Sequence, residues 1–226
     1  MGTMNTAPTA DERTPRRVLD PLDRLSEVLF GVLMALSFTG SIAIATSGRE
    51  DIREMLIGAI GCNTAWGIAD AVIYLATTLA DRGRNLRMVH SIRREKDPAE
   101  AHRTIGHALP PLVASLLRPS DFDHLRRGIL ALPDVPSEAR LTAADFRGAL
   151  GVFLLVFLST FPLVVPFLVI AEPVRALRTS HAIAVAMLYL IGHSWGRYSG
   201  HHPVRMGLAM LALGLVLVAT IIALGG

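Results

Sequence analysis

The chain has 226 residues, of which 51% are hydrophobic and only 18% are charged, and its mean hydropathy is +0.45. This composition is typical of a membrane protein that crosses the bilayer several times and keeps a sizeable polar part. The positive charge is almost wholly arginine, since Lys96 is the only lysine, and it is not gathered with aromatic residues, which argues against nucleic-acid binding. The single cysteine, Cys62, excludes an intrachain disulfide and a cysteine-rich metal site.

Residues 1–24 contain no apolar run and are rich in Thr, Pro, Asp and Arg, so we predict a disordered cytosolic tail. The first predicted membrane span covers residues 25–46. Glu27 stands at its entrance, and Met34 lies seven residues later on the same face. The loop at 47–54 is so short that the first two spans are expected to be antiparallel neighbours.

The second predicted span, residues 55–80, carries Asp70 near its middle. A carboxylate at that depth costs roughly 2.5–3.5 kcal/mol, so a partner charge, a bound cation, a water-filled path or protonation must compensate for it. Asn63 and Tyr74 fall on the same helical face and extend a polar stripe. Asp70 is therefore either part of an ion or proton pathway or one half of a structural pair, with His193, or Tyr189 one turn before it, as the candidate partner.

Residues 81–145 form a polar segment with a near balance of acidic and basic residues, which favours a solvated cytosolic subdomain of short amphipathic helices. Ser120 is the predicted N-cap of the last of these helices. The candidate metal ligands of this segment are two pairs, each with its members seven positions apart: Glu95 with His102, and Glu100 with His107. The alternative is that these residues form a solvated helix face.

Three further apolar segments are predicted to span the membrane, at residues 146–171, 181–198 and 207–224. Pro162 and Pro166 lie inside the first of them. Because proline frees backbone carbonyls that need a partner or a cavity, we expect a kinked helix that lines a path.

The expected fold is therefore all-α: a polytopic membrane protein of five transmembrane helices with a cytosolic helical insert between helices 2 and 3. Arginine is concentrated in the tail, in the insert and in the turn before the last span, which places the N-terminus in the cytosol and the C-terminus outside. The expected location is the inner (plasma) membrane of a bacterium. The predicted domains are 1–24, 25–80, 81–145 and 146–226.

Five spans with an insert after the second resemble the vacuolar iron transporter family. The stretch from Glu27 to Val32, EVLFGV, is similar to the opening of that family's first helix. The stretch from Phe157 to Leu168 resembles its Pro-containing third helix, and Pro203 to Gly225 resembles its last. The resemblance implies a homodimer in the bilayer that transports Fe²⁺ or Mn²⁺, with exchange for protons as an open option.

The chain departs from the family at the ion-binding positions. Leu33-Met34-Ala35 stands where the family has an Asn-Asp-Gly turn, and Tyr74-Leu75-Ala76 stands where it has Gly-Glu-Tyr. A transporter would then use a pathway of Asp70, Asn63, Tyr74, Glu27, Met34 and His193. The alternative is a transport-inactive membrane scaffold or regulator with the family's shape.

No nucleophile motif, phosphate-binding loop or HExxH is present, so we expect neither an enzyme nor a resident cofactor. Small residues in the first two spans permit close approach of helices and predict a homodimer packed through them. These residues are Gly31 and Ala35, Gly58 and Cys62, and Ala59 and Asn63. They are equally suited to packing spans within one chain.

Overall fold

The computed structural model describes residues 19–40 and 49–223, and within these ranges the regular elements are α-helices, with no strand. The chain divides into two compact units. The first combines Met1–Tyr74 with Ala144–Gly226, and the second is Leu75–Ala143. The prediction of an all-α protein is confirmed for the described part of the chain.

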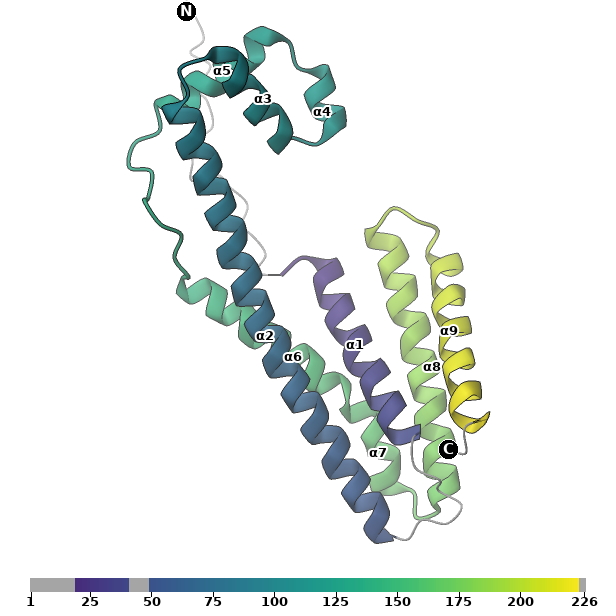
Figure 1. The fold of residues 1–226 in the computed structure, drawn as a ribbon. Coiled ribbons are helices and arrows are strands. Elements are labelled where there is room, and N and C mark those ends of the chain that lie inside the picture. The colour runs from purple at the N-terminus through teal and green to yellow at the C-terminus, as the bar shows by residue number, and fades with distance from the viewer. Residues whose placement is uncertain (1–18, 41–48, 224–226) are drawn as a thin grey trace, which may run out of the picture. The chain divides into compact units, whose positions relative to one another are not determined.

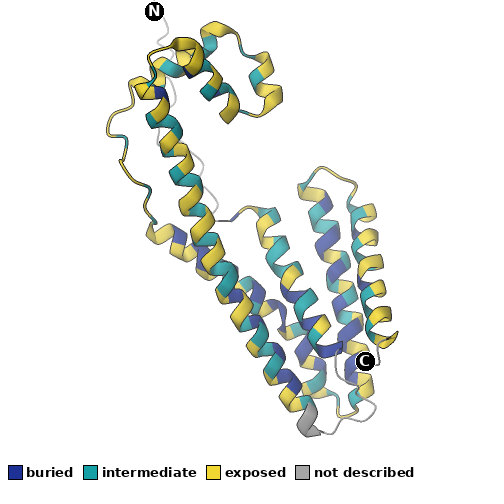
Figure 2. Cartoon of the chain, in the orientation of Figure 1, coloured by how far each residue is buried: buried dark blue, intermediate teal, exposed yellow. Residues whose placement is uncertain are grey.

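The first unit is built from several helices around an apolar core (Figure 1). Its elements are α1 (Pro21–Gly40), the first part of α2 (Arg49–Arg94), α6 (Ala143–Ser159), α7 (Phe161–Val169), α8 (Pro173–Tyr198) and α9 (Pro203–Ala223). The core joins Val32 and Leu36 of α1 to Leu163 of α7 and to Ala184 and Leu188 of α8, all of them at most 1% exposed. Figure 2 shows these helices with their buried positions turned toward one another. Close packing of these side chains gives many dispersion contacts, so this cluster holds the unit together.

Helices α8 and α9 pack against each other at glycine residues. A Cβ atom on Gly192 would lie 2.7 Å from the carbonyl oxygen of Met206, and one on Gly207 would lie 2.8 Å from the ring of Tyr189. Close approach at glycine is typical of helix pairs in membranes, where dispersion contacts replace the hydrophobic effect as the driving force.

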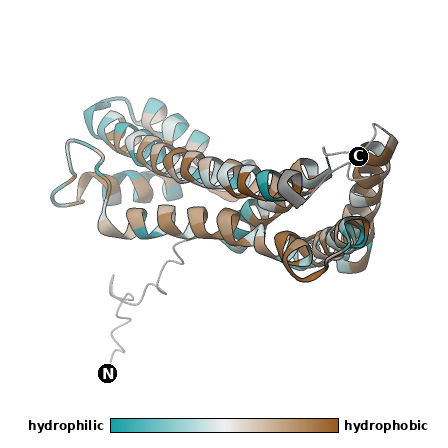
Figure 3. Ribbon diagram, turned by 90° about the horizontal axis from the view of Figure 1, so that it is seen from below, coloured by the Kyte–Doolittle hydropathy of each residue, from teal (hydrophilic) through white to brown (hydrophobic). Residues whose placement is uncertain are grey.

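Four helical segments of the described chain are long and apolar enough to cross a membrane, which indicates a membrane protein. They are Ile52–Arg94, Ala143–Val169, Pro173–Tyr198 and Pro203–Ala223. Figure 3 shows hydrophobic residues along most of α6 and α9.

Helix α1 is not among these four segments. Its first two turns carry Asp23, Arg24 and Glu27, and the predicted continuation of this span at 41–46 lies outside the described residues. The helix also begins inside the predicted tail, because Asp20 accepts a hydrogen bond from the Leu22 amide at 2.9 Å and caps the first turn. The predicted disorder is thus wrong for the end of the tail, and residues 1–18 lie outside the described part.

Helix α2 is longer than the predicted second span at both ends. The predicted loop at 47–54 is wrong from Arg49 onward, and the helix runs without a break past Ala80, the predicted end of the span, as far as Arg94. A helix satisfies its own backbone hydrogen bonds in lipid and in water alike, so a change of polarity does not end it. An ion pair between Asp81 and Arg84, one turn apart, supports the polar part.

In the second unit, the end of α2 is accompanied by α3 (Pro98–Ala108), α4 (Pro111–Leu116) and α5 (Pro119–Leu130). Ile92, Ala101 and Ile105 form its buried core. Arg118 is the N-cap of α5, and its backbone N–H donates a hydrogen bond to the Asp121 carboxylate at 2.8 Å. The prediction of Ser120 as the N-cap is therefore wrong. The proline that follows Arg118 has a backbone angle suited to the first helical position, which sets the earlier start.

Candidate functional site

A buried amide joins three helical segments of the first unit. Asn63 on α2 is 1% exposed, and its Nδ2 atom donates one hydrogen bond to the carbonyl of Gly31 on α1, at 3.2 Å. The same atom donates a second to the hydroxyl of Thr160, between α6 and α7. Loss of a buried hydrogen-bond partner costs about 1–3 kcal/mol, so Asn63 fixes the crossing of these segments.

Helices α1 and α2 run antiparallel, as the sequence predicts. The carbonyl of Gly31 meets Asn63, and the ring of Phe38 lies against Gly58, where a Cβ atom would be 2.7 Å from it. Residue numbers therefore rise along one helix as they fall along the other.

Two carboxylates lie on the same side of this crossing. Glu27 is one turn before Gly31 and Asp70 is two turns after Asn63, which leaves an offset of about 5 Å along the helix axes. The charge of Asp70 accordingly acts on Glu27, with Asp23 as a smaller source of repulsion. Two such groups repel each other unless a proton or a cation lies with them.

Neither carboxylate has a counterion in the described part of the chain. Glu27 and Asp70 are both half-buried, and neither takes part in an ion pair or hydrogen bond with the described residues. Oδ2 of Asp70 is buried without a partner among them. A buried carboxylate oxygen in this state is costly, which marks the position as a candidate site for a ligand or a proton.

Asp70 lies between two contacts of α2 with α6. Gly67, three residues earlier, meets the backbone of Phe153, whose carbonyl oxygen would be 3.2 Å from a Cβ atom. Tyr74, four residues later, places its phenol in the space left by the missing side chain of Gly148. The face of α2 that carries Asp70 is therefore turned toward α6, and Tyr74 is one turn from the carboxylate.

Two predicted pathway residues lie apart from the carboxylates. Met34 is half-buried on α1, two turns beyond Glu27. His193 on α8 has its ring against that of Tyr189, with 6.0 Å between centroids, and its Nδ1 atom is buried without a partner among the described residues. The hypothesis that Asp70 and His193 form a structural pair is wrong within this part of the chain, because neither group bonds the other.

In the second unit, the spacing argument for the first metal pair is wrong. Glu95 lies between α2 and α3, where its carboxylate accepts a hydrogen bond from the Asp97 amide at 2.9 Å. Asp97 in turn caps α3, so Glu95 and His102 do not share one helix face. The Asp-Pro step starts a new helix here and breaks the periodicity on which the pairing depends.

The other candidate ligands have partners of their own. Glu100 pairs with Arg103 at 2.5 Å, and His102 pairs with Asp123 of α5 at 2.9 Å. His107 is exposed in the last turn of α3. In the regions that the structure describes, no three His, Cys, Asp or Glu side chains are grouped as a metal site would need.

The span with two prolines is interrupted at Thr160, where the sequence predicts a kinked helix, and Pro166 lies inside α7. Helix α6 ends at Ser159, and α7 begins after Thr160 with Pro162 in its first turn. The Ser180 hydroxyl of α8 donates to the carbonyl of Leu163 at 2.8 Å, which supports the backbone near the break. Sequence analysis missed Thr160 as a partner of the polar stripe, although a Ser-Thr pair just before a Phe-Pro step in an apolar stretch is a recognisable signal.

The small residues expected at a dimer interface pack within the chain. A Cβ atom on Gly31 would lie 2.7 Å from the carbonyl oxygen of Val156, and Gly58 lies against Phe38. Ala59 is 1% exposed. These residues therefore pack helices of one chain against each other, which is the alternative that the sequence left open.

Chemically, the first unit offers two carboxylates, Glu27 and Asp70, that can share a proton or bind a cation. Carboxylate and amide oxygens suit hard and borderline divalent ions such as Mn²⁺. A scan of protein-family models and a search of curated proteins found no match to this sequence.

Proposed function

We propose that the protein transports divalent metal ions, Fe²⁺ or Mn²⁺, across a membrane, in the manner of the vacuolar iron transporters that it resembles. The observation that carries the proposal is the pair formed by Glu27 and Asp70. Both are half-buried, they repel each other, and neither has a counterion among the described residues. A cation that binds and leaves, exchanged for protons, relieves this repulsion in both states.

Each residue then has a distinct role. Asp70 binds the ion or the proton, and Glu27 lies at the cytosolic entrance. The amide nitrogen of Asn63 is held by Gly31 and Thr160, so its oxygen is the atom that remains for the ion. Tyr74, one turn from Asp70, and Asn63, two turns from it on the other side, are successive polar contacts along the path. Met34 and His193 lie further along it.

The same proposal includes five spans, namely the four apolar segments described above and α1 in addition. The N-terminus and the insert lie in the cytosol and the C-terminus outside, in the inner membrane of a bacterium. The distribution of arginine supports this orientation. The proposed assembly is a homodimer, which rests on the resemblance to the family, because the small residues of α1 and α2 are used within the chain.

The test is uptake of Fe²⁺ and Mn²⁺ into liposomes that contain the purified protein and an internal metal-sensitive dye. Asp70→Asn and Glu27→Gln should each abolish uptake while the protein still folds. Glu172→Gln is the matched control, because Glu172 only pairs with Arg175 on the surface and its loss should leave uptake unchanged.

A second candidate is a transport-inactive scaffold or regulator. It is supported by Leu33-Met34-Ala35 at the family's ion-binding turn and by the absence of a three-ligand metal group from the described residues. Wild-type liposomes that take up no more Fe²⁺, Mn²⁺, Co²⁺ or Zn²⁺ than empty ones would reject the transporter and favour this candidate.

A further inference from the structure

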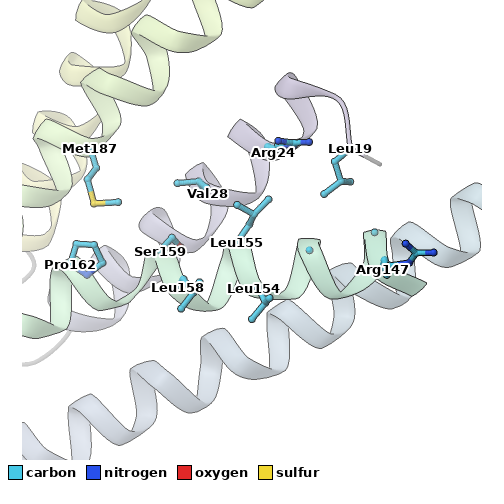
Figure 4. A pocket seen from close by; sticks show the side chains of 12 residues that line it. Leu19, Arg24, Val28, Arg147, Leu154, Leu155, Leu158, Ser159, Pro162 and Met187 are labelled. Atoms are coloured by element: carbon cyan, nitrogen blue, oxygen red, sulfur yellow. The ribbon is translucent and has the colours of Figure 1, made fainter. Parts of the chain in front are cut away.

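A groove of about 560 Å³ runs between α1 and α6 of the first unit (Figure 4). Its walls are mainly apolar, with Val28 from α1, Leu154, Leu155 and Leu158 from α6, and Met187 from α8. Leu154 and Leu158 are 39% and 55% exposed, so the groove opens on the outside of the unit. In a protein with four helices apolar enough to cross a membrane, such an opening faces lipid chains.

Two arginines lie at one end of this groove. Figure 4 shows Arg24 and Arg147 at the end nearest Leu19, and Pro162 and Met187 at the opposite end. Each arginine lies within the first five residues of its helix, α1 or α6. The positive ends of two helix dipoles therefore add to the two guanidinium charges.

The length of the groove matches one leaflet of a bilayer. Arg147 and Leu158 both line it and are 11 residues apart on one helix, which corresponds to about 16 Å of rise. Half of a typical hydrocarbon core is about 15 Å. A headgroup at the arginines would thus leave its acyl chain room to run along α6 to the middle of the membrane.

We infer that this groove binds one anionic phospholipid, with its headgroup at the end where Arg24 and Arg147 lie and one acyl chain along α6. Guanidinium groups bind phosphate oxygens through paired hydrogen bonds, and a net negative headgroup is attracted to both arginines, whereas a choline headgroup carries its own positive charge. Glu27 and Asp70 do not line the groove. The lipid site is therefore independent of the transport proposal.

The experiment measures which lipid the purified full-length protein retains from a mixture of phosphatidylglycerol and phosphatidylcholine with identical chains. We expect one retained phosphatidylglycerol per chain, detected by native mass spectrometry. Arg24→Gln alone should lower the preference for phosphatidylglycerol by about fivefold, the effect of one basic residue near an anionic lipid. Arg24→Gln combined with Arg147→Gln should abolish the preference.

A second set of variants blocks the acyl chain and spares the arginines. Gly151 lines the groove, and Gly151→Phe should reduce retention of both lipids. Leu158→Trp adds bulk at an exposed wall position and provides the same test with less risk to folding. Gly61→Phe is the matched control for bulk, since nothing lies within 4 Å of Gly61, and Arg197→Gln with Arg205→Gln is the matched control for charge.

Equal retention of the two lipids by the wild-type protein would overturn the inference. So would an unchanged preference in the double arginine variant, or displacement of the lipid by glycerol phosphate alone, which would indicate an anion site with no role for the groove. Circular dichroism and gel filtration of each variant separate loss of lipid from loss of fold.

Discussion

The side-chain amide of Asn63 donates a hydrogen bond to the backbone carbonyl of Gly31 at 3.2 Å, from α2 to α1. The bond is possible because Gly31 has no side chain at the point where α1 also meets Ser159 and Val156. One glycine thus permits both the helix crossing and the polar contact, one turn from Glu27.

Asn63→Leu should lower the free energy of unfolding by about 1–3 kcal/mol, because it leaves the carbonyl of Gly31 and the hydroxyl of Thr160 without this buried donor. Denaturant unfolding in detergent measures the change. Thr64→Val is the control, since the Thr64 hydroxyl bonds only the carbonyl of Ile60 in its own helix, at 2.7 Å. Equal effects of the two variants would contradict a bridging role for Asn63.

Gly31→Ala should destabilise the first unit by about 1–3 kcal/mol, the typical cost of overpacking. The new methyl group would collide with the Ser159 side chain and would lie 2.7 Å from the Val156 carbonyl oxygen. Ser159→Ala should recover only part of the loss, since the carbonyl stays in place. Gly61→Ala, in open space on the same kind of helix, should be neutral or stabilising by about 0.5–1 kcal/mol.

Asp70→Asn should leave the melting temperature unchanged or raise it, because it removes a carboxylate whose buried oxygen has no partner among the described residues. In the double variant with His193→Gln, the two changes in the free energy of unfolding should be additive within about 0.5 kcal/mol, as expected for groups that do not interact. A double-mutant cycle from thermal unfolding checks both statements. A coupling energy well above that limit would show that Asp70 and His193 do interact as a structural pair.

Ile92→Ala should cost about 2–5 kcal/mol, because Ile92 is fully buried in the core of the second unit. Hydrogen exchange at the amides of α3 and α5 should speed up accordingly. His102→Gln should cost less than about 1 kcal/mol, since the bond to Asp123 lies at a partly exposed surface. A larger effect of His102→Gln than of Ile92→Ala would show that polar contacts, not packing, hold this unit.

Reporter fusions at Arg49, Asp97 and Gly226 test the topology. Five spans place Asp97 in the cytosol and both Arg49 and Gly226 outside, in agreement with the arginine distribution. Activity of alkaline phosphatase and fluorescence of a cytosolic reporter distinguish the two sides. If Asp97 and Gly226 report the same side, the membrane is crossed an even number of times between them and the five-span arrangement is wrong.

Several features follow from local chemistry, and the sequence alone predicts them. The apolar stretches indicate membrane helices because lipid offers no hydrogen-bond partners, and a helix pairs its own backbone N–H and C=O groups. Pro162 and Pro166 predict a kink in the third span because proline has no N–H to donate to the helix, and the structure has a break there, at Thr160. The antiparallel arrangement of α1 and α2 follows from a connection too short for any other. The helical face shared by Asn63, Asp70 and Tyr74 follows from the period of 3.6 residues.

Other features depend on contacts between distant parts of the chain, which no local pattern contains. Helix α2 continues to Arg94 because polarity changes along it while its hydrogen bonding does not. The partner of Asn63 is Thr160, 97 residues away, and Asp70 is near Glu27 and not bonded to His193. Sequence alone thus determined that Asp70 needs compensation for its charge. Only the packing of α1, α2 and α6 decided that a second carboxylate, and not a histidine, lies beside it, because the helix crossing at Gly31 sets which side chains meet.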